Sequence, residues 1–298
     1  MTPRSMNYQR IIALGYDYGA QAKVRPAECN LCRARGRAVE VAARDRYGYP
    51  ATFVVCRCCG LGYLCPRLSA TQYAHFYSEI YRPLVSAYHD RRIDAETLQL
   101  EQRGYAVDLG AFLLPLLPSS PRTILDIGGS TGVVARVLAA HLNAHATVLD
   151  PAPDELAVAR AAGMETVAGL VEDFDPGERR WDLVLLCQTI DHLLDARGTL
   201  AALRRMTAVG GHAFVDIVDV DVLLRRTGCI ERVIKIDHPY SLTRSTAMAL
   251  FALTGFTIVA ERLSDDGHRG FVLAPGPCAD PDWLALTVTA ARFLNSVI

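Results

Sequence analysis

The segment TILDIGGSTG, residues 123–132, constrains the fold of this chain more than any other part of the sequence. A short apolar run ends in a turn that contains Gly128, Gly129 and Gly132, and a helical pattern begins at Val133. A strand, a glycine-rich turn and a helix in this order allow a ligand to approach the backbone closely at the carboxyl edge of a sheet. The glycines do not follow the G-x-G-x-x-G spacing of dinucleotide sites.

Two carboxylates accompany this turn. Asp126 precedes it by two residues, where its charge would repel a pyrophosphate but would suit a cofactor that carries an ammonium and a sulfonium group. Asp150 ends the next apolar run, where a carboxylate can accept hydrogen bonds from both hydroxyls of a ribose. The alternative for Asp150 is a helix N-cap ahead of Pro151.

Strand and helix patterns alternate along the second half of the chain. Strands are predicted at residues 123–127, 147–149, 181–187, 210–218, 257–260 and 270–274, and helices at 133–141, 154–162, 193–206, 241–254 and 281–298. This alternation indicates parallel pairing in a doubly wound α/β domain. Residues 71–118 have a helical pattern, and the prolines and serines of PLLPSSPR, residues 115–122, mark a boundary after it. We therefore predict an amino-terminal region at 1–70, a helical linker or lid at 71–118, a domain at 119–275 and a final helix at 276–298.

Taken together, these segments resemble class I, S-adenosylmethionine-dependent methyltransferases. The resemblance covers residues 120–275 and rests on LDIGGSTG, VLDP, VEDF, WDLVLL, IDHLLD and the glycine pair at 210–211, which occur in the family's order and spacing. It implies a Rossmann-like, seven-stranded α/β sheet. It also implies the cofactor-binding residues: Asp126, Gly128, Gly129 and Gly132 around the methionine part, Asp150 with Pro151 at the ribose, Glu172 or Asp173 near the adenine, and Gln188 after the fourth strand. Many members have Cys or another small residue in place of Gly129, and this departure is expected to cost little, because only a small residue is needed there.

The cysteines are clustered. Six of the nine lie between residues 29 and 65, and four of them form the pairs Cys29-x2-Cys32 and Cys56-x2-Cys59. In a cytosolic chain such pairs more often bind a metal than form disulfides, and two knuckles place four thiolates as a structural zinc ion requires. Cys58 or Cys65 could replace one of the four, and cysteines without a metal are the alternative.

The second knuckle leads into a tyrosine-rich segment. The stretch CRCCGLGYLCP, followed by YAHFYSEIY, resembles the amino-terminal zinc module of bacterial methyltransferases that act on sugars, including C-methyltransferases of deoxysugar nucleotides. In those enzymes a Tyr-x-Glu-His segment supplies acid and base groups. Asp237 and His238 match its last two positions, and Lys235 replaces the tyrosine. The sequence has no counterpart of their long carboxyl-terminal domain, so we do not expect their exact chemistry.

Methyl transfer to a hydroxyl requires a base, most often a histidine or a carboxylate. His238, beside Asp237, is the first candidate, and a loop histidine without a catalytic role is its alternative. His192 in IDHL is the second, and its alternative is to pack against and cap a helix. His268 is a weaker candidate.

Charge and composition restrict the function further. The net charge is −1, but residues 1–60 carry ten Lys and Arg against four Asp and Glu, an excess of +6. No run is long enough for a membrane span, and we expect a cytoplasmic enzyme without a membrane partner. Our leading hypothesis is O-methylation of a sugar, as a nucleotide-linked or glycan intermediate. The alternatives are a ribosomal RNA base methyltransferase with a zinc knuckle, for which the basic region would suit a phosphate backbone, and a methyltransferase of another small-molecule natural product. A homodimer is compatible with the sequence.

Overall fold

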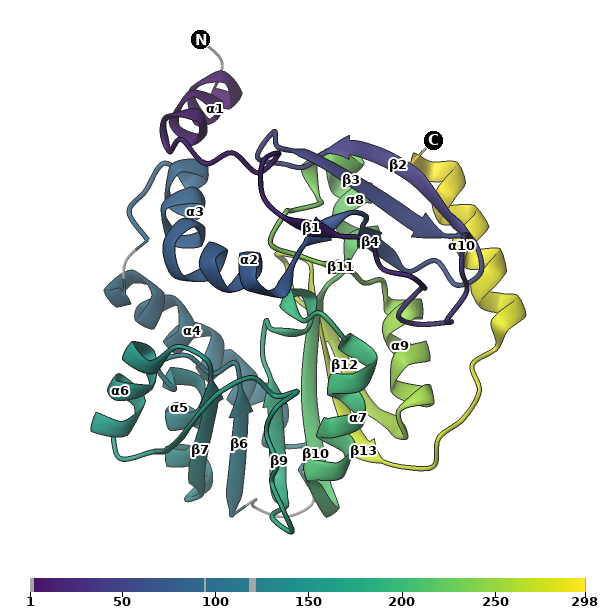
Figure 1. Ribbon diagram of the computed structural model, residues 1–298. Coiled ribbons are helices and arrows are strands. Elements are labelled where there is room, and N and C mark those ends of the chain that lie inside the picture. Colours follow the sequence, from purple (N-terminus) through teal and green to yellow (C-terminus); the bar gives the residue numbers. More distant parts are fainter. Residues whose placement is uncertain (1–2, 94, 118–121, 298) are drawn as a thin grey trace.

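A seven-stranded sheet forms the centre of the second half of the chain in the computed structural model, which describes residues 3–93, 95–117 and 122–297 (Figure 1). Its strand order is β12-β13-β10-β9-β6-β7-β8. The strands are β6 (Thr123–Ile127), β7 (His145–Asp150), β8 (Glu165–Ala168), β9 (Trp181–Leu186), β10 (Thr207–Val218), β12 (Phe256–Leu263) and β13 (His268–Pro275). The predicted Rossmann-like, seven-stranded class I sheet is therefore confirmed.

Two strands depart from the predicted parallel pairing. β8, β7, β6, β9 and β10 are parallel, but β13 pairs antiparallel with β10, and β12 pairs antiparallel with β13. Only residues 264–267 connect β12 to β13. Without a crossover helix, two neighbouring strands can pair only as a hairpin.

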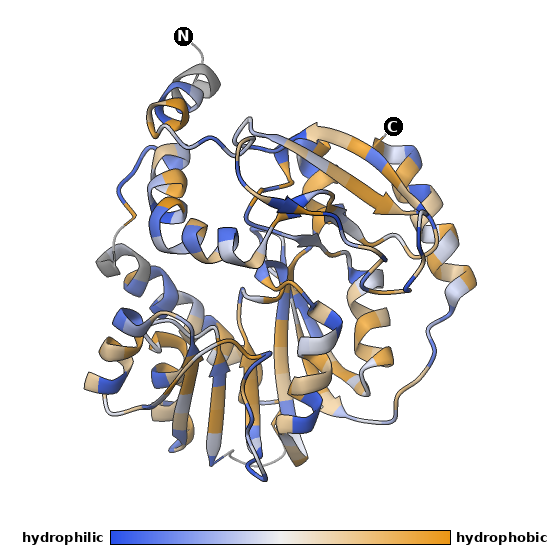
Figure 2. Cartoon of the chain, viewed as in Figure 1, coloured by the Kyte–Doolittle hydropathy of each residue, from blue (hydrophilic) through white to orange (hydrophobic). Residues whose placement is uncertain are grey.

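Helices cover both faces of this sheet because alternate residues of each strand point to opposite sides. Leu183 and Leu185 of β9 belong to one apolar cluster, and Val184 and Leu186 to the other. The first cluster includes buried residues of α4 (Ala95–Leu113), α5 (Val133–Leu142) and α6 (Pro153–Ala161). The second includes residues of α7 (Ala196–Met206) and α9 (Arg244–Leu253). Figure 2 shows hydrophobic residues along the central strands between these layers.

The amino-terminal region contains a second sheet that the sequence analysis did not predict. Its order is β11-β4-β3-β2, formed by β2 (Ala38–Arg44), β3 (Pro50–Cys56), β4 (Gly62–Leu64) and β11 (Tyr240–Ser241). A smaller pair joins β1 (Lys23–Val24) to β5 (Arg67–Leu68). β11 comes from far along the chain and pairs with β4, so this sheet joins the amino-terminal region to the domain that follows.

Helices precede and follow these sheets. α1 (Pro3–Ala13) begins the described chain, and the predicted helical stretch at 71–118 contains α2 (Ala70–His75), the π-helix η1 (Phe76–Ile80), α3 (Tyr81–His89) and α4. Residue 118 lies outside the described residues. The predicted final helix is α10 (Trp283–Val297). The prediction missed β8, which has four residues, none of them buried, and α8 (Val220–Thr227). Two short 3-10 turns, η2 (Ile190–His192) and η3 (Ile230–Arg232), complete the elements.

Among residues 3–93, 95–117 and 122–297, no helix is long and apolar enough to cross a lipid bilayer.

We expect Leu185→Ala to lower the free energy of unfolding by about 2–5 kcal/mol, because the Leu185 side chain is fully buried at the sheet centre and its loss leaves a cavity. Urea denaturation monitored by circular dichroism measures this change. Leu284→Ala is the matched control, because Leu284 is 77% exposed and its truncation should change stability by no more than about 0.5 kcal/mol. Equal losses in the two variants would contradict the assigned core.

Candidate active site

The glycine-rich turn lies at the carboxyl edge of the sheet, between β6 and α5. Gly128 and Gly132 both have positive φ, +70° and +72°, which residues with a Cβ rarely adopt. A Cβ on Gly132 would lie 2.4 Å from Met164 Cε. The turn is therefore packed tightly against neighbouring side chains, and only glycine fits there without displacing them.

Gly129 lies in a crowded part of the turn. A Cβ at this position would lie 2.7 Å from Asp126 Cγ and 2.9 Å from Val148 Cγ1. Real Cβ atoms essentially never come this close to other atoms, so a side chain here would require the turn or these neighbours to shift. The buried Asp126 carboxyl occupies the space that a side chain would need, so glycine suits this position, where only a small residue was expected.

Asp126 lies at the floor of a small pocket of about 30 Å³ beneath this turn. Asp126 is 1% exposed, and among the described residues its Oδ2 has no hydrogen-bond partner. Burial, with a smaller contribution from the nearby Asp150, raises the pKa of Asp126 to about 7. An unpaired buried carboxylate is costly, and a cationic group bound in the pocket would remove that cost. Asp126 thus fits the ammonium of an amino-acid cofactor.

Asp150 ends β7 beside the same turn. Its Oδ2 accepts a hydrogen bond from Ser130 N at 2.9 Å, and its Oδ1 accepts one from Ala152 N at 2.8 Å. The carboxylate therefore fixes the glycine turn relative to β7. Each oxygen keeps a lone pair, so the group can still accept hydrogen bonds from ribose hydroxyls.

The other predicted cofactor residues lie at the same edge but are more exposed. Gln188 lines the Asp126 pocket, and its backbone N–H donates to the Asp216 carboxylate. Glu172 and Asp173 follow β8, and the Glu172 carboxylate accepts a hydrogen bond from the Thr199 hydroxyl of α7. Pro151 is exposed directly after Asp150. Their roles in cofactor binding stay predictions.

Four residues that line this pocket were missed: Gln102, Tyr105, Val134 and Cys187. Gln102 and Tyr105 of α4 line the Asp126 pocket, and the Tyr105 hydroxyl donates to Asp216 Oδ2 at 2.9 Å. Their i,i+3 spacing places them on one face of a helix, a pattern that sequence inspection can find. Which edge of the sheet that face covers depends on tertiary packing.

His192 and His238 meet just beyond Gln188. Their ring centroids are 4.7 Å apart at an interplanar angle of 82°. His192 Nδ1 lies 3.0 Å from the Asp237 carbonyl oxygen and 2.8 Å from the Tyr77 hydroxyl, which itself donates to the same carbonyl at 2.7 Å. These partners place the ring proton of His192 on Nδ1. Asp191 does not orient His192, since its Oδ2 accepts from Val218 N.

His238 is buried among charged groups. Its Nε2 lies 3.3 Å from Lys235 Nζ and 3.4 Å from Asp237 Oδ2. Burial, with help from Lys235 and His192, holds the pKa of His238 well below its ordinary value. Both carboxylate oxygens of Asp237 lack a hydrogen-bond partner, and the residue is fully buried. The cluster therefore places an imidazole that favours its neutral form beside the carboxyl group of Asp237.

This spacing would also suit a metal ion, because the ligand atoms of His192, Asp237 and His238 lie within 4.8 Å of one another. Lys235 argues against that interpretation, since its amino group already lies next to His238 Nε2. The weaker candidate, His268, lies apart in the β12–β13 hairpin, where its Nδ1 is 2.9 Å from Asp266 Oδ2.

Residues of the amino-terminal region hold the segment that carries His238. Arg46 N donates to the Ile234 carbonyl at 3.0 Å, and Ile236 N donates to Asp45 Oδ2 at 3.0 Å. The Tyr73 hydroxyl donates to the Ile236 carbonyl at 3.1 Å. The position of His238 thus depends on residues nearly 200 positions earlier in the chain.

The four predicted cysteines come together in the amino-terminal region. Cys29 Sγ and Cys59 Sγ are 3.5 Å apart, Cys32 Sγ and Cys56 Sγ are 3.6 Å apart, and all four sulfur atoms lie within 4.8 Å of one another. Four thiolates around a zinc ion with bonds of about 2.3 Å would be separated by about 3.8 Å. No bond joins them, since all nine cysteines are free. The donor set and its spacing fit a structural zinc ion.

Cys58 and Cys65, the two possible replacements, lie outside this group of four. Gly60 N donates to the Cys56 carbonyl at 2.8 Å, and Arg33 N donates to the Cys29 carbonyl at 2.9 Å, so each Cys pair closes a tight turn. Gly60 has a φ of +80° in the second turn.

We expect Asp126→Asn to weaken S-adenosylmethionine binding at least tenfold in titration calorimetry, because the cationic group loses its carboxylate partner. Asp175→Asn, an exposed change outside the pocket, is the control and should bind normally.

The same variant tests the pKa of Asp126. The folded pKa of about 7 lies above the unfolded value of about 3.9, so the folded state binds more protons between these values and loses stability as the pH rises through them. Without cofactor, Asp126→Asn should therefore gain stability relative to the native protein by on the order of 1 kcal/mol or more between pH 5 and pH 8. A pH-independent difference in urea denaturation would contradict the assignment.

Comparisons with known proteins agree with this architecture. The model of a family described as a methyltransferase domain matches residues 98–261. A ubiquinone biosynthesis O-methyltransferase from Methylobacterium sp. (strain 4-46) is 37% identical over 111 residues, which cover 34% of this chain and only 43% of that relative.

Two solved structures share the fold. The PH0226 protein from Pyrococcus horikoshii OT3 has a TM-score of 0.51 at 18% identity, covering 59% of this chain and 91% of its own. Magnesium protoporphyrin IX methyltransferase from Synechocystis PCC 6803, solved with bound SAH, has a TM-score of 0.52 at 13% identity. The match covers 69% of this chain and 99% of that structure. The family match spans more than half of the chain, so this protein belongs to the methyltransferase domain family and has the class I fold of the S-adenosylmethionine-dependent enzymes.

Proposed function

We propose that this protein transfers a methyl group from S-adenosylmethionine to a hydroxyl of a sugar, with His238 as the general base. The observation that carries the proposal is the buried cluster of His238, Asp237 and His192 beside the cofactor edge of the sheet. A cofactor site alone does not require such a cluster, whereas deprotonation of a hydroxyl does.

The cofactor supplies an electrophilic methyl group when it is bound. Asp126 and Asp150 would hold its two ends, and its methyl group would leave the sulfonium sulfur, which becomes a neutral thioether, for the acceptor oxygen. His238 would accept the proton of that hydroxyl on its imidazole. Asp237, 3.4 Å from Nε2, stabilises the imidazolium that forms. Burial, with help from Lys235, lowers the pKa of His238 and so favours the neutral imidazole beforehand.

Support for an oxygen acceptor comes from two sources. The relative from Methylobacterium is named as an O-methyltransferase, although the alignment covers less than half of it. The neutral imidazole of His238 is the form that can accept a proton from a hydroxyl. Support for a sugar comes from the sequence resemblance of the cysteine module and the tyrosine-rich segment to bacterial sugar methyltransferases.

Several arginines of the amino-terminal region already have partners within the protein, which makes the RNA alternative less favourable. Arg33 and Arg35 both face Glu28, at 2.7 and 3.5 Å. The Arg46 guanidinium lies 4.1 Å from the centre of the Tyr88 ring, so it is used inside the protein. These arginines are therefore partly neutralised or packed, and fewer are left for a phosphate backbone than the sequence suggested.

We further propose that Cys29, Cys32, Cys56 and Cys59 bind a structural zinc ion. Four thiolates close the coordination shell, so the ion would contribute to folding rather than to catalysis. Cys29, Cys56 and Cys59 are buried in the same apolar cluster as β9 and α7, so loss of the ion would disturb the core and not only a surface loop.

We expect elemental analysis to find about one zinc ion per chain in the native protein and in Cys58→Ala, but substantially less in Cys32→Ala. Removing the metal with a chelator should lower the melting temperature, because ligand binding to the folded state stabilises it. Normal zinc content in Cys32→Ala would exclude the proposed ligand set.

His238→Ala should reduce turnover by about 10²–10⁴-fold while leaving S-adenosylmethionine affinity unchanged, because His238 moves a proton but lies beyond the cofactor pocket. His141→Ala, an exposed change on α5, is the control. Radiolabelled methyl transfer to a panel of nucleotide-linked sugars measures turnover. Near-normal turnover in His238→Ala would remove it as the base, and transfer only to ribosomal RNA fragments would replace the sugar proposal by its alternative.

A further inference from the structure

A second cavity lies apart from the proposed methyl-transfer site. Its volume is about 510 Å³, within the range of small-molecule sites. It lies between α8, the first turn of α9, β13, α10 and the second cysteine knuckle, where Cys59 and Gly60 form part of its wall. Neither the Asp126 pocket nor the His238 cluster contributes a residue to it.

Four arginines line this cavity, and they come from four different elements. They are Arg225 of α8, Arg244 of α9, Arg269 of β13 and Arg292 of α10. Residues far apart in the sequence thus bring four guanidinium groups to one hollow. Guanidinium groups are planar donors whose geometry matches the oxygens of phosphate and carboxylate groups.

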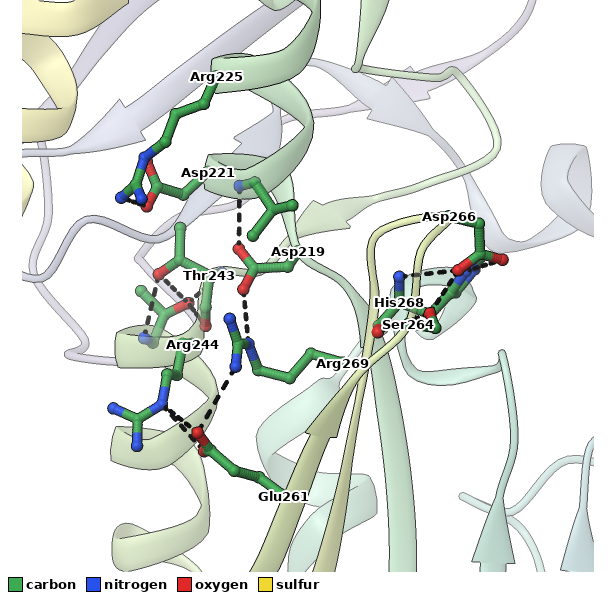
Figure 3. A network of polar contacts seen from close by, with 12 residues as sticks. Asp219, Asp221, Arg225, Thr243, Arg244, Glu261, Ser264, Asp266, His268 and Arg269 are labelled. Carbon is green, nitrogen blue, oxygen red and sulfur yellow. Dashed lines mark hydrogen bonds and ion pairs between the residues drawn. The ribbon is translucent and has the colours of Figure 1, made fainter. Parts of the chain in front are cut away.

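Acidic residues neutralise only part of this charge (Figure 3). Arg269 Nε lies 2.7 Å from Asp219 Oδ2, and its Nη1 lies 3.5 Å from Glu261 Oε1. Arg244 Nε lies 2.9 Å from both Glu261 oxygens.

The remaining two arginines, Arg225 and Arg292, are less constrained by ion pairs. Arg225 pairs with Asp221 one helical turn away, and its side chain is 75% exposed. Within the described part of the chain, Arg292 has no ion pair or hydrogen bond. Four arginines therefore face three carboxylates, Asp219, Asp221 and Glu261, which leaves a net charge of +1.

The start of α9 adds to this excess. Thr243 caps the helix, Arg244 is its first residue, and the first turn contains no acidic side chain. A helix N-terminus carries about half a positive charge, so a cation is unfavourable there. The positive charge of Arg244 therefore lies unfavourably close to the positive end of α9, and a bound anion would reduce this repulsion.

We propose that this cavity binds a phosphorylated small molecule, with its phosphate oxygens between Arg225, Arg244 and Arg292. Arg269 is committed to Asp219 and Glu261 and forms the rigid base of the site. The volume exceeds what an inorganic phosphate needs, so the ligand carries a further group that reaches toward Gly60 and α10. The proposal does not depend on the identity of the methyl acceptor.

Titration calorimetry on the zinc-loaded protein, saturated with S-adenosylhomocysteine to fill the cofactor site, tests this proposal. The probes are inorganic pyrophosphate and uridine diphosphate in low-salt buffer. We expect both to bind with submillimolar dissociation constants and the nucleotide to bind more tightly, because it fills more of the cavity. Binding of both should weaken as salt is added.

The double variant Arg225→Gln, Arg292→Gln should weaken both probes at least tenfold. Neither substitution breaks a buried ion pair, so the fold should persist, which circular dichroism verifies. Arg205→Gln is the control: Arg205 donates only within α7 and lies outside the cavity, so binding should be unchanged. Absence of binding at millimolar probe, or equal affinity in the double variant and the native protein, would overturn the proposal. Tighter binding of pyrophosphate than of the nucleotide would refute the claim that the ligand carries a further group.

Discussion

The buried carboxylate of Asp45 is the interaction on which the arrangement of the active site depends most. Its two oxygens accept three backbone hydrogen bonds, from Tyr47, Tyr49 and Ile236, each at 3.0 Å. Two of these donors shape the turn between β2 and β3, and the third belongs to the segment that carries His238. Burial raises the pKa of Asp45 to about 7, while the three N–H groups oppose that shift. The Asp45 side chain thus links the amino-terminal sheet to the segment that carries the proposed base. The cysteine region is therefore held against the following domain and is not connected to it through the chain alone.

The same connection links the cysteine cluster to the segment that carries the proposed base. Cys56 ends β3, β3 pairs with β4, and β4 pairs with β11, which follows His238 by two residues. Fixing the knuckles therefore fixes the strand from which the histidine segment extends. On the other side of the segment, the Asn30 side chain donates to Asp195 Oδ1 at 2.7 Å, so the first knuckle also holds the start of α7. A zinc ion at this position would act through backbone geometry over a distance, as structural metals do.

The sequence predicted the parts of the structure whose signal is local. The glycine turn, Asp126 and Asp150 follow from a short motif, and most strands and helices of the sheet follow from periodicity. The cysteine pairs follow from spacing. It did not predict β11, Gln102 or Tyr105, because each obtains its role from a partner far away in the sequence. β11 has only two residues and exists because β4 lies beside it. β8 was missed because it is a short, partly exposed edge strand. α8 was missed because it has only eight residues, although its buried Val220 and Leu224 are spaced one helical turn apart.

The distribution of buried acids explains how this site can be both stable and reactive. Asp126, Asp191 and Asp237 each have at least one carboxylate oxygen without a partner, and all lie at or near the carboxyl edge of the sheet. Burial raises the pKa of Asp126 and Asp191 to about 7, so each costs stability when it ionises near neutral pH. A protein tolerates such a cost where a ligand removes it. In the proposed reaction, a cationic group of the cofactor would offset the charge of Asp126, and the proton that His238 accepts would offset the charge of Asp237. The two unpaired acids would then lie where the proposal brings positive charge into the site.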